Sequence, residues 1–232
     1  MNYPGISILM PTYNRNNFFE LALDNILSQN YPREKLEWII IDDGEKNFIE
    51  DEDNIRDMIF PIKLKYLRID PKNKISIGEK RNLLVNYCEY DYCINMDDDD
   101  IYLDDYIINS INQLIKNDVG LVGSNQMIFY FHKYNKFTKI ICGQKRQIHE
   151  GTMCFTKDHW KKTGGFLNRP SGEGPKMIDG YEEFVYNENI DNLMYCLCHD
   201  NNTYSKKYFF FKPEIKIELN PKKSKIINKI NF

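Results

Sequence analysis

Short apolar runs recur along the first half of the chain, and each is closed by a polar or turn-forming stretch. They are four to six residues long, and most are rich in β-branched side chains, which predicts short buried strands. Only one of them, at 64–69, alternates apolar and polar positions. The runs lie at residues 6–10, 38–41, 64–69, 92–96 and 120–124.

Between these runs the apolar residues fall near helical spacing. Helices are therefore expected over residues 18–27, 78–88 and 104–117. The polar segment 45–57 is expected to form a loop with one helical turn. Strands that alternate with helices of ten or more residues imply right-handed βαβ units and a parallel sheet. The predicted fold class is therefore α/β.

The alternation of predicted strands and helices ends at about residue 125. Residues 127–134 and 137–142 are expected to form a hairpin, and residues 193–198 a further strand. Residues 167–176 are rich in Gly and Pro, which favours a mobile loop. The lysine-rich last dozen residues, 221–232, are expected to be peripheral.

Three of the predicted strands end in polar residues. The first runs into Pro11-Thr12-Tyr13-Asn14, the second into Asp42-Asp43-Gly44, and the fourth into the tract Asp97 to Asp100. In an open parallel sheet the ligand lies beyond the carboxyl ends of the strands. We therefore expect these three segments to gather at one edge and to form a binding site.

The four consecutive aspartates, Asp97 to Asp100, are the strongest chemical signal in the chain. Adjacent carboxylates repel one another by up to about 1 kcal/mol per close pair even in high dielectric. One explanation is a divalent metal, because Mg²⁺ and Mn²⁺ prefer carboxylate oxygens. The other is a solvated acidic loop that caps the following helix.

Composition excludes several classes of protein. With 42% hydrophobic and 28% charged residues, the 232-residue chain is an ordinary globular protein. The net charge of −3 provides no field that favours nucleic acid. None of the six cysteines has CxxC spacing, so no zinc framework is expected and the thiols are expected to be reduced. Because no signal peptide or membrane span is apparent, a cytoplasmic protein is expected.

Five ordered motifs resemble those of the GT-A fold glycosyltransferases of the family-2 type. The resemblance is good over about residues 5–125 and looser afterwards. The motifs are Pro11-Thr12-Tyr13-Asn14-Arg15, Asp42-Asp43-Gly44, Gly78-Glu79-Lys80-Arg81-Asn82, the DxD tract within Asp97 to Asp100, and Gly164-Gly165-Phe166. The resemblance implies a Rossmann-like, mainly parallel sheet with helices on both faces. Residues 1–125 would be the nucleotide-sugar-binding half, and residues 126–232 the acceptor-binding half with α+β structure.

The resemblance also implies an activity and a set of site residues. The activity is metal-dependent hexosyl transfer, with inversion, from a nucleoside diphosphate sugar, most often a UDP-sugar. The acceptor would be a hydroxyl of a saccharide, protein or lipid, and the cofactor Mn²⁺ or Mg²⁺. Residues expected to bind the nucleotide sugar are Pro11, Thr12, Tyr13, Asn14, Asp42, Asp43, Arg81, Asp97 and Asp98. Residues expected to bind the metal are Asp97, Asp99 and His199, and Asp100 is left as a candidate helix cap.

An inverting transfer also needs a general base for the acceptor hydroxyl. The family places a Glu-Asp pair some residues after Gly-Gly-Phe, and this sequence departs from that pattern. The candidates are Glu173, Glu182 and Glu183, of which Glu173 is favoured as the catalytic residue. The missing pair keeps a catalytically inactive sugar- or nucleotide-binding relative as an alternative. A nucleotidyltransferase is a second alternative, although Pro11 to Asn14 replaces the glycine-rich phosphate loop expected there.

Overall fold

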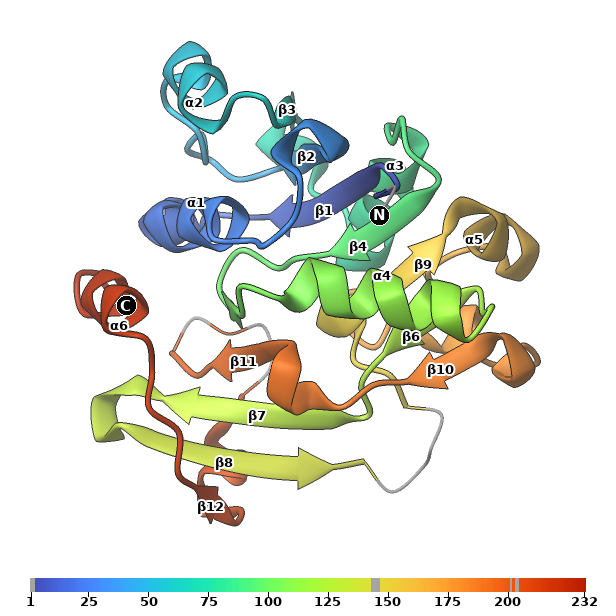
Figure 1. The fold of residues 1–232 in the computed structure, drawn as a ribbon. Coiled ribbons are helices and arrows are strands. Elements are labelled where there is room, and N and C mark those ends of the chain that lie inside the picture. The colour runs from blue at the N-terminus through green and yellow to red at the C-terminus, as the bar shows by residue number, and fades with distance from the viewer. Residues whose placement is uncertain (1–2, 143–146, 201, 203–204) are drawn as a thin grey trace.

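The computed structural model describes residues 3–142, 147–200, 202 and 205–232. The strands of these residues form a seven-stranded sheet of order β10-β6-β9-β4-β1-β2-β3 and a five-stranded sheet of order β12-β8-β7-β11-β5 (Figure 1). The strands are β1 (Ile6–Thr12), β2 (Leu36–Asp42), β3 (Lys63–Arg68), β4 (Tyr92–Asn95), β5 (Ile101–Tyr102), β6 (Leu121–Gly123), β7 (Gln126–Phe131), β8 (Lys136–Ile141), β9 (Cys154–Thr156), β10 (Val185–Asn187), β11 (Met194–Leu197) and β12 (Glu214–Ile215). The α-helices are α1 (Phe19–Leu27), α2 (Glu52–Ile59), α3 (Ile77–Asn86), α4 (Tyr106–Lys116), α5 (Lys157–Thr163) and α6 (Pro221–Ile227).

The strand β1 lies at the centre of a parallel core. It pairs in parallel with β2 and β4, and β2 pairs in parallel with β3. Every residue of β1 and β2 is buried, which explains why their sequences are nearly continuous apolar runs. The strand β3 lies at the edge, and its mixed burial agrees with the alternation at residues 64–69. The predicted α/β fold is confirmed.

Different helices cover the two faces of the large sheet. Neighbouring residues of β1 point to opposite faces, because side chains alternate along a strand. Ile8 packs in the same apolar cluster as Leu21 of α1 and Ile107 of α4, whereas Leu9 packs with Leu84 of α3. In Figure 1, α4 crosses in front of the sheet and α3 lies behind it. Helices on both faces agree with the expected architecture.

One strand breaks the parallel pattern of the large sheet. The strand β9 lies between β4 and β6 and pairs antiparallel with both of them. The strand β10 then pairs in parallel with β6 at the far edge. No local pattern indicates this insertion, because β4 and β9 are far apart in the sequence.

The small sheet is built around the predicted hairpin. The strands β7 and β8 pair antiparallel, and Asn135, with φ of 45°, takes the left-handed conformation at their turn. The strand β11 pairs in parallel with β7 and antiparallel with β5, which follows the aspartate tract directly. The tract therefore lies between β4 of one sheet and β5 of the other.

Residues 221–232 are mostly exposed or half-buried, but their helix α6 packs against α1. Lys223 and Ile227 of α6 are buried. The Lys223 Nζ atom lies 2.7 Å from Asp24 Oδ2 on α1, and α6 lies below α1 in Figure 1. The local sequence cannot predict this contact. A lysine is buried only where a carboxylate pairs with it, and here the carboxylate is about 200 residues away in the sequence.

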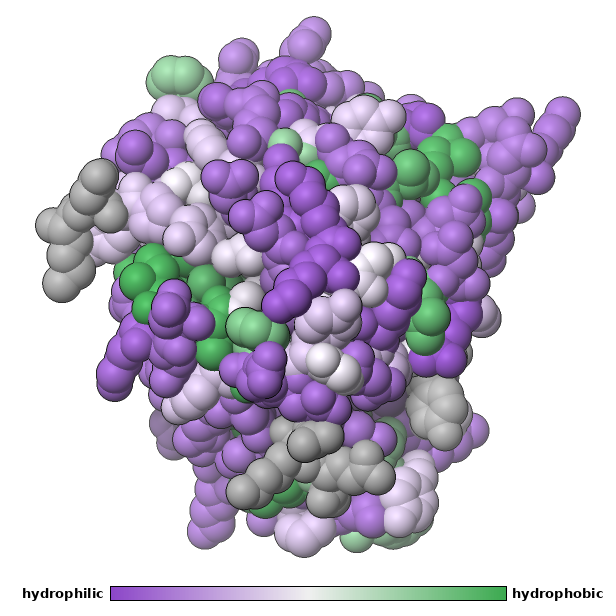
Figure 2. All heavy atoms as spheres, turned by 90° about the vertical axis from the view of Figure 1, so that its right-hand side faces the viewer, coloured by the Kyte–Doolittle hydropathy of each residue, from purple (hydrophilic) through white to green (hydrophobic). Residues whose placement is uncertain are grey.

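The face that carries α5 and β10 is mostly hydrophilic, and its apolar side chains form only small separate groups (Figure 2). Within the described parts of the chain, no helix has the length and apolar character needed to cross a bilayer.

Candidate active site

The carboxyl ends of β1, β2 and β4 lie next to one another. Thr12, in the last position of β1, is in register with Asp42, in the last position of β2. On the other side of β1, Leu9 is in register with Asn95, the last residue of β4 before the aspartate tract. The polar segments that follow the three strands therefore share one edge of the sheet.

The loops after β1 and β2 are interlocked. Asn14 has a positive φ of 52°, and its Oδ1 atom accepts a hydrogen bond of 2.7 Å from the backbone N–H of Glu45. A Cβ atom on Gly44 would lie 2.7 Å from the Asn14 nitrogen, so this position requires glycine. Asn14 and Gly44, which belong to two different motifs, thus hold the two loops against each other.

The carboxylate of Asp42 is bonded to other residues of the protein. Its carboxylate is 1% exposed and accepts hydrogen bonds from the backbone N–H groups of Gly44 and Phe48, both at 2.8 Å, and from the Tyr66 hydroxyl at 2.6 Å. It also forms an ion pair with Arg68. The structure thus places Asp42 beneath the loop that follows β2, where it holds the loop in place.

Asp43 lies beside a buried lysine that sequence reasoning did not single out. Lys80 forms an ion pair with Asp43 and donates a 2.7 Å hydrogen bond to the Thr12 carbonyl. Burial lowers the pKa of Lys80 in spite of Asp43. The Tyr13 ring lies 3.5 Å from the Lys74 ammonium and 5.6 Å from that of Lys80. This corner offers an aromatic ring, two cations and a carboxylate.

Arg81 joins two predicted site residues. Its Nη2 atom lies 2.9 Å from Asp97 Oδ1, and its Nε atom lies 2.8 Å from Glu173 Oε1. Burial lowers the pKa of Arg81, but Asp97 and Glu173 outweigh this and raise it above its usual value. Among the described atoms, the buried Nη1 atom has no hydrogen-bond partner. Arg81 therefore holds both carboxylates and keeps one donor available.

Asp99 contacts His199, which follows β11 of the small sheet. His199 Nε2 lies 3.1 Å from Asp99 Oδ2, and Arg15 Nη2 lies 3.3 Å from the same oxygen. Burial raises the pKa of Asp99, but His199 and Arg15 outweigh burial and hold it below its usual value. The His199 ring packs against the rings of Phe18 and Phe232, with centroid distances of 4.7 and 5.6 Å. The imidazole is thus fixed in its orientation toward Asp99.

The other two aspartates of the tract are buried, and burial raises the pKa of both well above the usual value. Asp100 Oδ1 accepts a 2.9 Å hydrogen bond from the Leu197 N–H of β11, and no side chain caps α4. The expectation that Asp100 caps the helix is therefore wrong. The raised pKa values favour the neutral carboxyl form of Asp98 and Asp100, in which the repulsion expected for four adjacent carboxylates is weaker.

The three candidate bases lie in different places. Glu173 is 3% exposed and is connected to Asp97 through Arg81. Glu182 and Glu183 belong to a short 3-10 helix just before β10, three strands away from β4 in the large sheet. The structure brings Glu173, and not the later pair, to the aspartate tract.

A further acidic residue near the tract was missed. Glu150 Oε1 accepts a 3.0 Å hydrogen bond from the Gly174 N–H, next to Glu173. Its backbone carbonyl accepts a 2.7 Å hydrogen bond from Asn95 Nδ2 at the end of β4. The sequence signal for this residue is the Glu150-Gly151 dipeptide before β9. It indicates a site residue only once β9 is known to pair with β4.

Asp99 and His199 are the side chains best placed to hold a cation. A carboxylate oxygen and an imidazole nitrogen form a donor set that suits Mn²⁺. Asp97, the third predicted ligand, directs its carboxylate to Arg81. In the part of the chain that the structure describes, no group of three or more His, Cys, Asp or Glu side chains is arranged to hold a metal. In this structure the two donors are paired with each other, and Arg15 contacts the same Asp99 oxygen.

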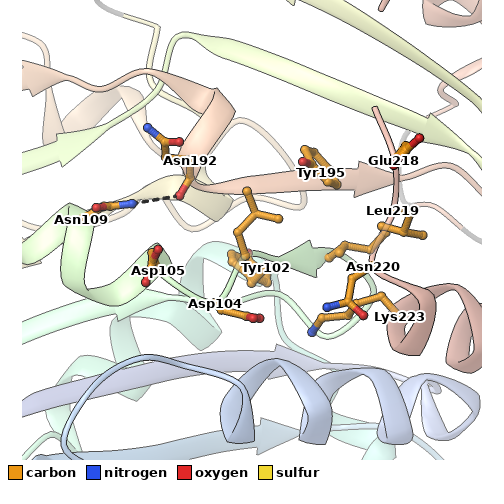
Figure 3. A pocket seen from close by; sticks show the side chains of 12 residues that line it. Tyr102, Asp104, Asp105, Asn109, Asn192, Tyr195, Glu218, Leu219, Asn220 and Lys223 are labelled. Carbon is orange, nitrogen blue, oxygen red and sulfur yellow. Dashed lines mark hydrogen bonds between the residues drawn. The ribbon is translucent and has the colours of Figure 1, made fainter. Parts of the chain in front are cut away.

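Two cavities lie near residues that follow or contact the tract. The larger has a volume of about 780 Å³ and is lined in part by His199. The smaller, about 220 Å³, lies between α4, β11 and the residues before α6 (Figure 3). Asn109 and Asn192 are hydrogen-bonded across it, and the ammonium of Lys223 at its edge is bound by Asp24 and Asn25.

This fold is the GT-A glycosyltransferase fold, as similar solved structures show. The structure of S. aureus TarS residues 1–349 in complex with UDP-GlcNAc superposes with a TM-score of 0.65 at 13% identity, over 86% of this chain and 60% of that one. The mannosyltransferase PcManGT from Pyrobaculum calidifontis, in complex with GDP-Man and Mn²⁺, gives 0.65 at 18% identity, over 88% and 59%.

The sequence identifies the family. Residues 7–172, well over half of the chain, match the model of glycosyl transferase family 2. The chain belongs to this family, and the resemblance of the five ordered motifs is confirmed.

Relatives that are named glycosyltransferases support this assignment. The O-antigen biosynthesis glycosyltransferase WbnJ of Escherichia coli is 25% identical over 208 residues, which are 83% of this chain and 77% of that protein. An uncharacterized glycosyltransferase of Haemophilus influenzae is 31% identical over 126 residues, 54% of this chain. The chain spans 48% of that relative and 20% of a similar one from Rickettsia felis.

Proposed function

We propose that this protein transfers a glycosyl unit from a nucleoside diphosphate sugar, most simply a UDP-sugar, to an acceptor hydroxyl, with a divalent cation and with inversion. Family membership supports glycosyl transfer. TarS in complex with UDP-GlcNAc and PcManGT in complex with GDP-Man and Mn²⁺ support a nucleotide-sugar donor and a metal. The observation that carries the proposal is the position of Asp99 beside His199 at the sheet edge where the aspartate tract leaves β4.

The nucleotide would bind at the interlocked loops after β1 and β2. Tyr13 supplies a ring face, while Asp43 and Lys80 supply a buried carboxylate and cation. The base and ribose of a nucleotide offer matching donors and acceptors to such groups. Thr12, Asn14 and Pro11 shape the loop, and Asp42 acts from beneath it.

The diphosphate would lie between Arg81 and the Asp99–His199 pair. Asp99 and His199 would hold the cation, which when bound offsets the negative charge that develops on the departing diphosphate. Arg81 has an unpartnered Nη1 donor, which is available to a phosphate or sugar oxygen. Asp97 and Asp98 would contact the donor sugar beside it.

Glu173 would serve as the general base. In a single displacement, the acceptor oxygen attacks the anomeric carbon while its proton passes to the Glu173 carboxylate. The bond from that carbon to the diphosphate oxygen breaks on the opposite face, which inverts the configuration. Arg81 binds Glu173 and Asp97 on two sides of one guanidinium, so it fixes the distance between base and donor.

A thermal-shift screen of nucleotides tests the proposal, because a ligand that binds only the folded state raises its melting temperature. We expect UDP with Mn²⁺ to raise the melting temperature more than GDP, CDP or Mn²⁺ alone. No shift with any nucleoside diphosphate would contradict the proposal. A shift with UDP but no turnover of any UDP-sugar would identify a catalytically inactive relative instead.

A further inference from the structure

The short 3-10 helix Glu150–Thr152, just before β9, lies between the aspartate tract and the loop after α5. A Cβ atom on Gly151 would lie 3.0 Å from Asp97 Oδ2. A Cβ atom on Gly174 would lie 3.0 Å from Glu150 Oε1. This turn is therefore in close contact with the tract on one side and with the loop that carries the proposed base on the other.

The turn is bound firmly to the end of β4. The Asn95 side-chain amide donates a 2.7 Å hydrogen bond to the Glu150 carbonyl. The Tyr102 hydroxyl donates a 2.9 Å hydrogen bond to the Gly151 carbonyl and accepts one of 2.8 Å from the Asp97 N–H. Asn95 and Tyr102 are both fully buried. The Glu150 side chain thus extends from a support whose position relative to Asp97 is fixed.

The Glu150 carboxylate binds the backbone next to the proposed base. Its Oε1 atom accepts a 3.0 Å hydrogen bond from the Gly174 N–H, and Gly174 directly follows Glu173. The carbonyl of the same peptide group, from Glu173, accepts a 2.9 Å hydrogen bond from the Leu167 N–H. The second bond lies within the loop after α5, whereas the bond to Glu150 connects this loop to the turn before β9.

A general base works only where its carboxylate is within hydrogen-bond reach of the proton that it accepts. A displacement of about 1 Å can lower the rate about a hundredfold. Arg81 binds the carboxylate of Glu173 at 2.8 Å and so orients it. A glutamate side chain has several rotatable bonds, so a contact at its carboxylate alone does not fix the backbone that carries it. Glu150 supplies the contact at that backbone.

We infer that Glu150 is a positioning residue for the general base. It holds the peptide group between Glu173 and Gly174 at a fixed place relative to Asp97, and it accepts no proton from the acceptor itself. The inference rests on the proposed function, because it adds a second residue to the machinery of that reaction.

Two substitutions of Glu150 separate positioning from proton transfer. Glu150→Ala removes the hydrogen-bond acceptor, whereas Glu150→Gln keeps an oxygen for the Gly174 N–H and removes the basic carboxylate. The assay is the release of UDP to water from UDP-GlcNAc or UDP-glucose with Mn²⁺. We expect Glu150→Ala to lower kcat about tenfold or more, with the donor KM and UDP binding unchanged. Glu150→Gln should stay within about threefold of wild type. An equal loss in both variants would overturn the inference.

A double-mutant cycle tests whether Glu150 acts through Glu173. In a Glu173→Gln background the base is already gone, so Glu150→Ala is expected to lower UDP release by less than about a further twofold. A further loss of about tenfold would show that Glu150 acts independently of Glu173, and the inference would be wrong.

Hydrogen exchange of the Gly174 amide reports on the contact without relying on activity. We expect this amide to exchange about tenfold faster in Glu150→Ala than in wild type, and at the wild-type rate in Glu150→Gln. Unchanged exchange in Glu150→Ala would overturn the inference. Glu52→Ala, at a half-buried position on α2, is the matched control and should change neither UDP release nor this exchange.

The wild-type protein distinguishes failure of this inference from failure of the proposed function. UDP release by wild type that Glu150→Ala leaves unchanged would overturn only the role of Glu150. The absence of UDP release by wild type from every UDP-sugar would overturn the proposed transfer, and the role of Glu150 with it.

Discussion

The Nε atom of Arg81 lies 2.8 Å from Oε1 of Glu173, although 92 residues separate them in the sequence. The same guanidinium binds Asp97 at 2.9 Å, so a single buried cation connects the aspartate tract to the loop after α5. This contact is the reason to choose Glu173 among the three candidate bases, and it leads to the first prediction.

Glu173→Gln is expected to lower the rate of transfer by at least about a hundredfold, because general acid–base catalysis commonly contributes that much. Glutamine keeps the shape and still accepts a hydrogen bond from Arg81, so UDP binding should be unchanged. Steady-state kinetics and UDP titration measure the two effects. Glu183→Gln is the matched control, and a large loss of rate in that variant would show that the base is Glu183.

Asp99→Asn is expected to weaken Mn²⁺ binding in the presence of UDP by at least tenfold and to lower turnover about a hundredfold. The amide removes the charge that faces His199 and the cation. Electron paramagnetic resonance of free Mn²⁺ measures the affinity without relying on activity. Asp104→Asn, in the segment between β5 and α4, should behave as wild type. Unchanged Mn²⁺ affinity in Asp99→Asn would contradict the assignment of this ligand.

The sequence alone predicts the core of this fold because its signals there are local. The strands β1, β2 and β4 are apolar runs, and each leads into polar residues that must share one sheet edge once the strands are parallel. Thr12 and Asp42 are indeed in register. Local signals also predict the β7–β8 hairpin, whose turn contains Asn135.

Contacts between distant segments could not be predicted in this way. The burial of Asp42 depends on Tyr66 and Arg68 from β3, and that of Asp100 on the Leu197 N–H of β11. From the sequence alone, each of these aspartates is expected to be an exposed ligand. The groups that donate hydrogen bonds to its carboxylate are far away in the sequence, so no neighbouring residue indicates that it is buried. Lys80 and Glu150 were missed for the same reason.

The ion pair between Lys223 and Asp24 is another distant contact, and both side chains are 5% exposed. Lys223→Met is expected to destabilise the protein by about 2–3 kcal/mol, because it leaves the buried Asp24 carboxylate with only the exposed Lys222 as a cation. Lys222 also contacts Asp24 but is 70% exposed. Lys222→Met should therefore cost less than about 1 kcal/mol. Urea denaturation compares the variants, and equal effects would contradict the role of the buried pair.

Glu188 makes the stability of the fold depend on pH. Burial raises its pKa from 4.5 to about 7. Between these values the folded state keeps a proton that the unfolded state loses, so the contribution to stability is full below pH 4.5 and lost as the pH rises through 7.

Glu188→Gln removes this dependence. We expect the variant to gain stability over wild type as the pH rises from 5 to 8, by about 2–3 kcal/mol at most. Chemical denaturation at several pH values measures the difference. The exposed Glu183→Gln is the control and should show no such trend. A constant difference between Glu188→Gln and wild type across this range would contradict the raised pKa.

The central claim is that the aspartate tract and His199 serve metal-dependent transfer from a nucleotide sugar. The most direct measurement is the release of UDP from UDP-GlcNAc and UDP-glucose by the purified protein, with Mn²⁺ and after treatment with EDTA. The account predicts UDP release from at least one donor with Mn²⁺ and a loss of more than about a hundredfold with EDTA. UDP release that is unaffected by EDTA would contradict the account.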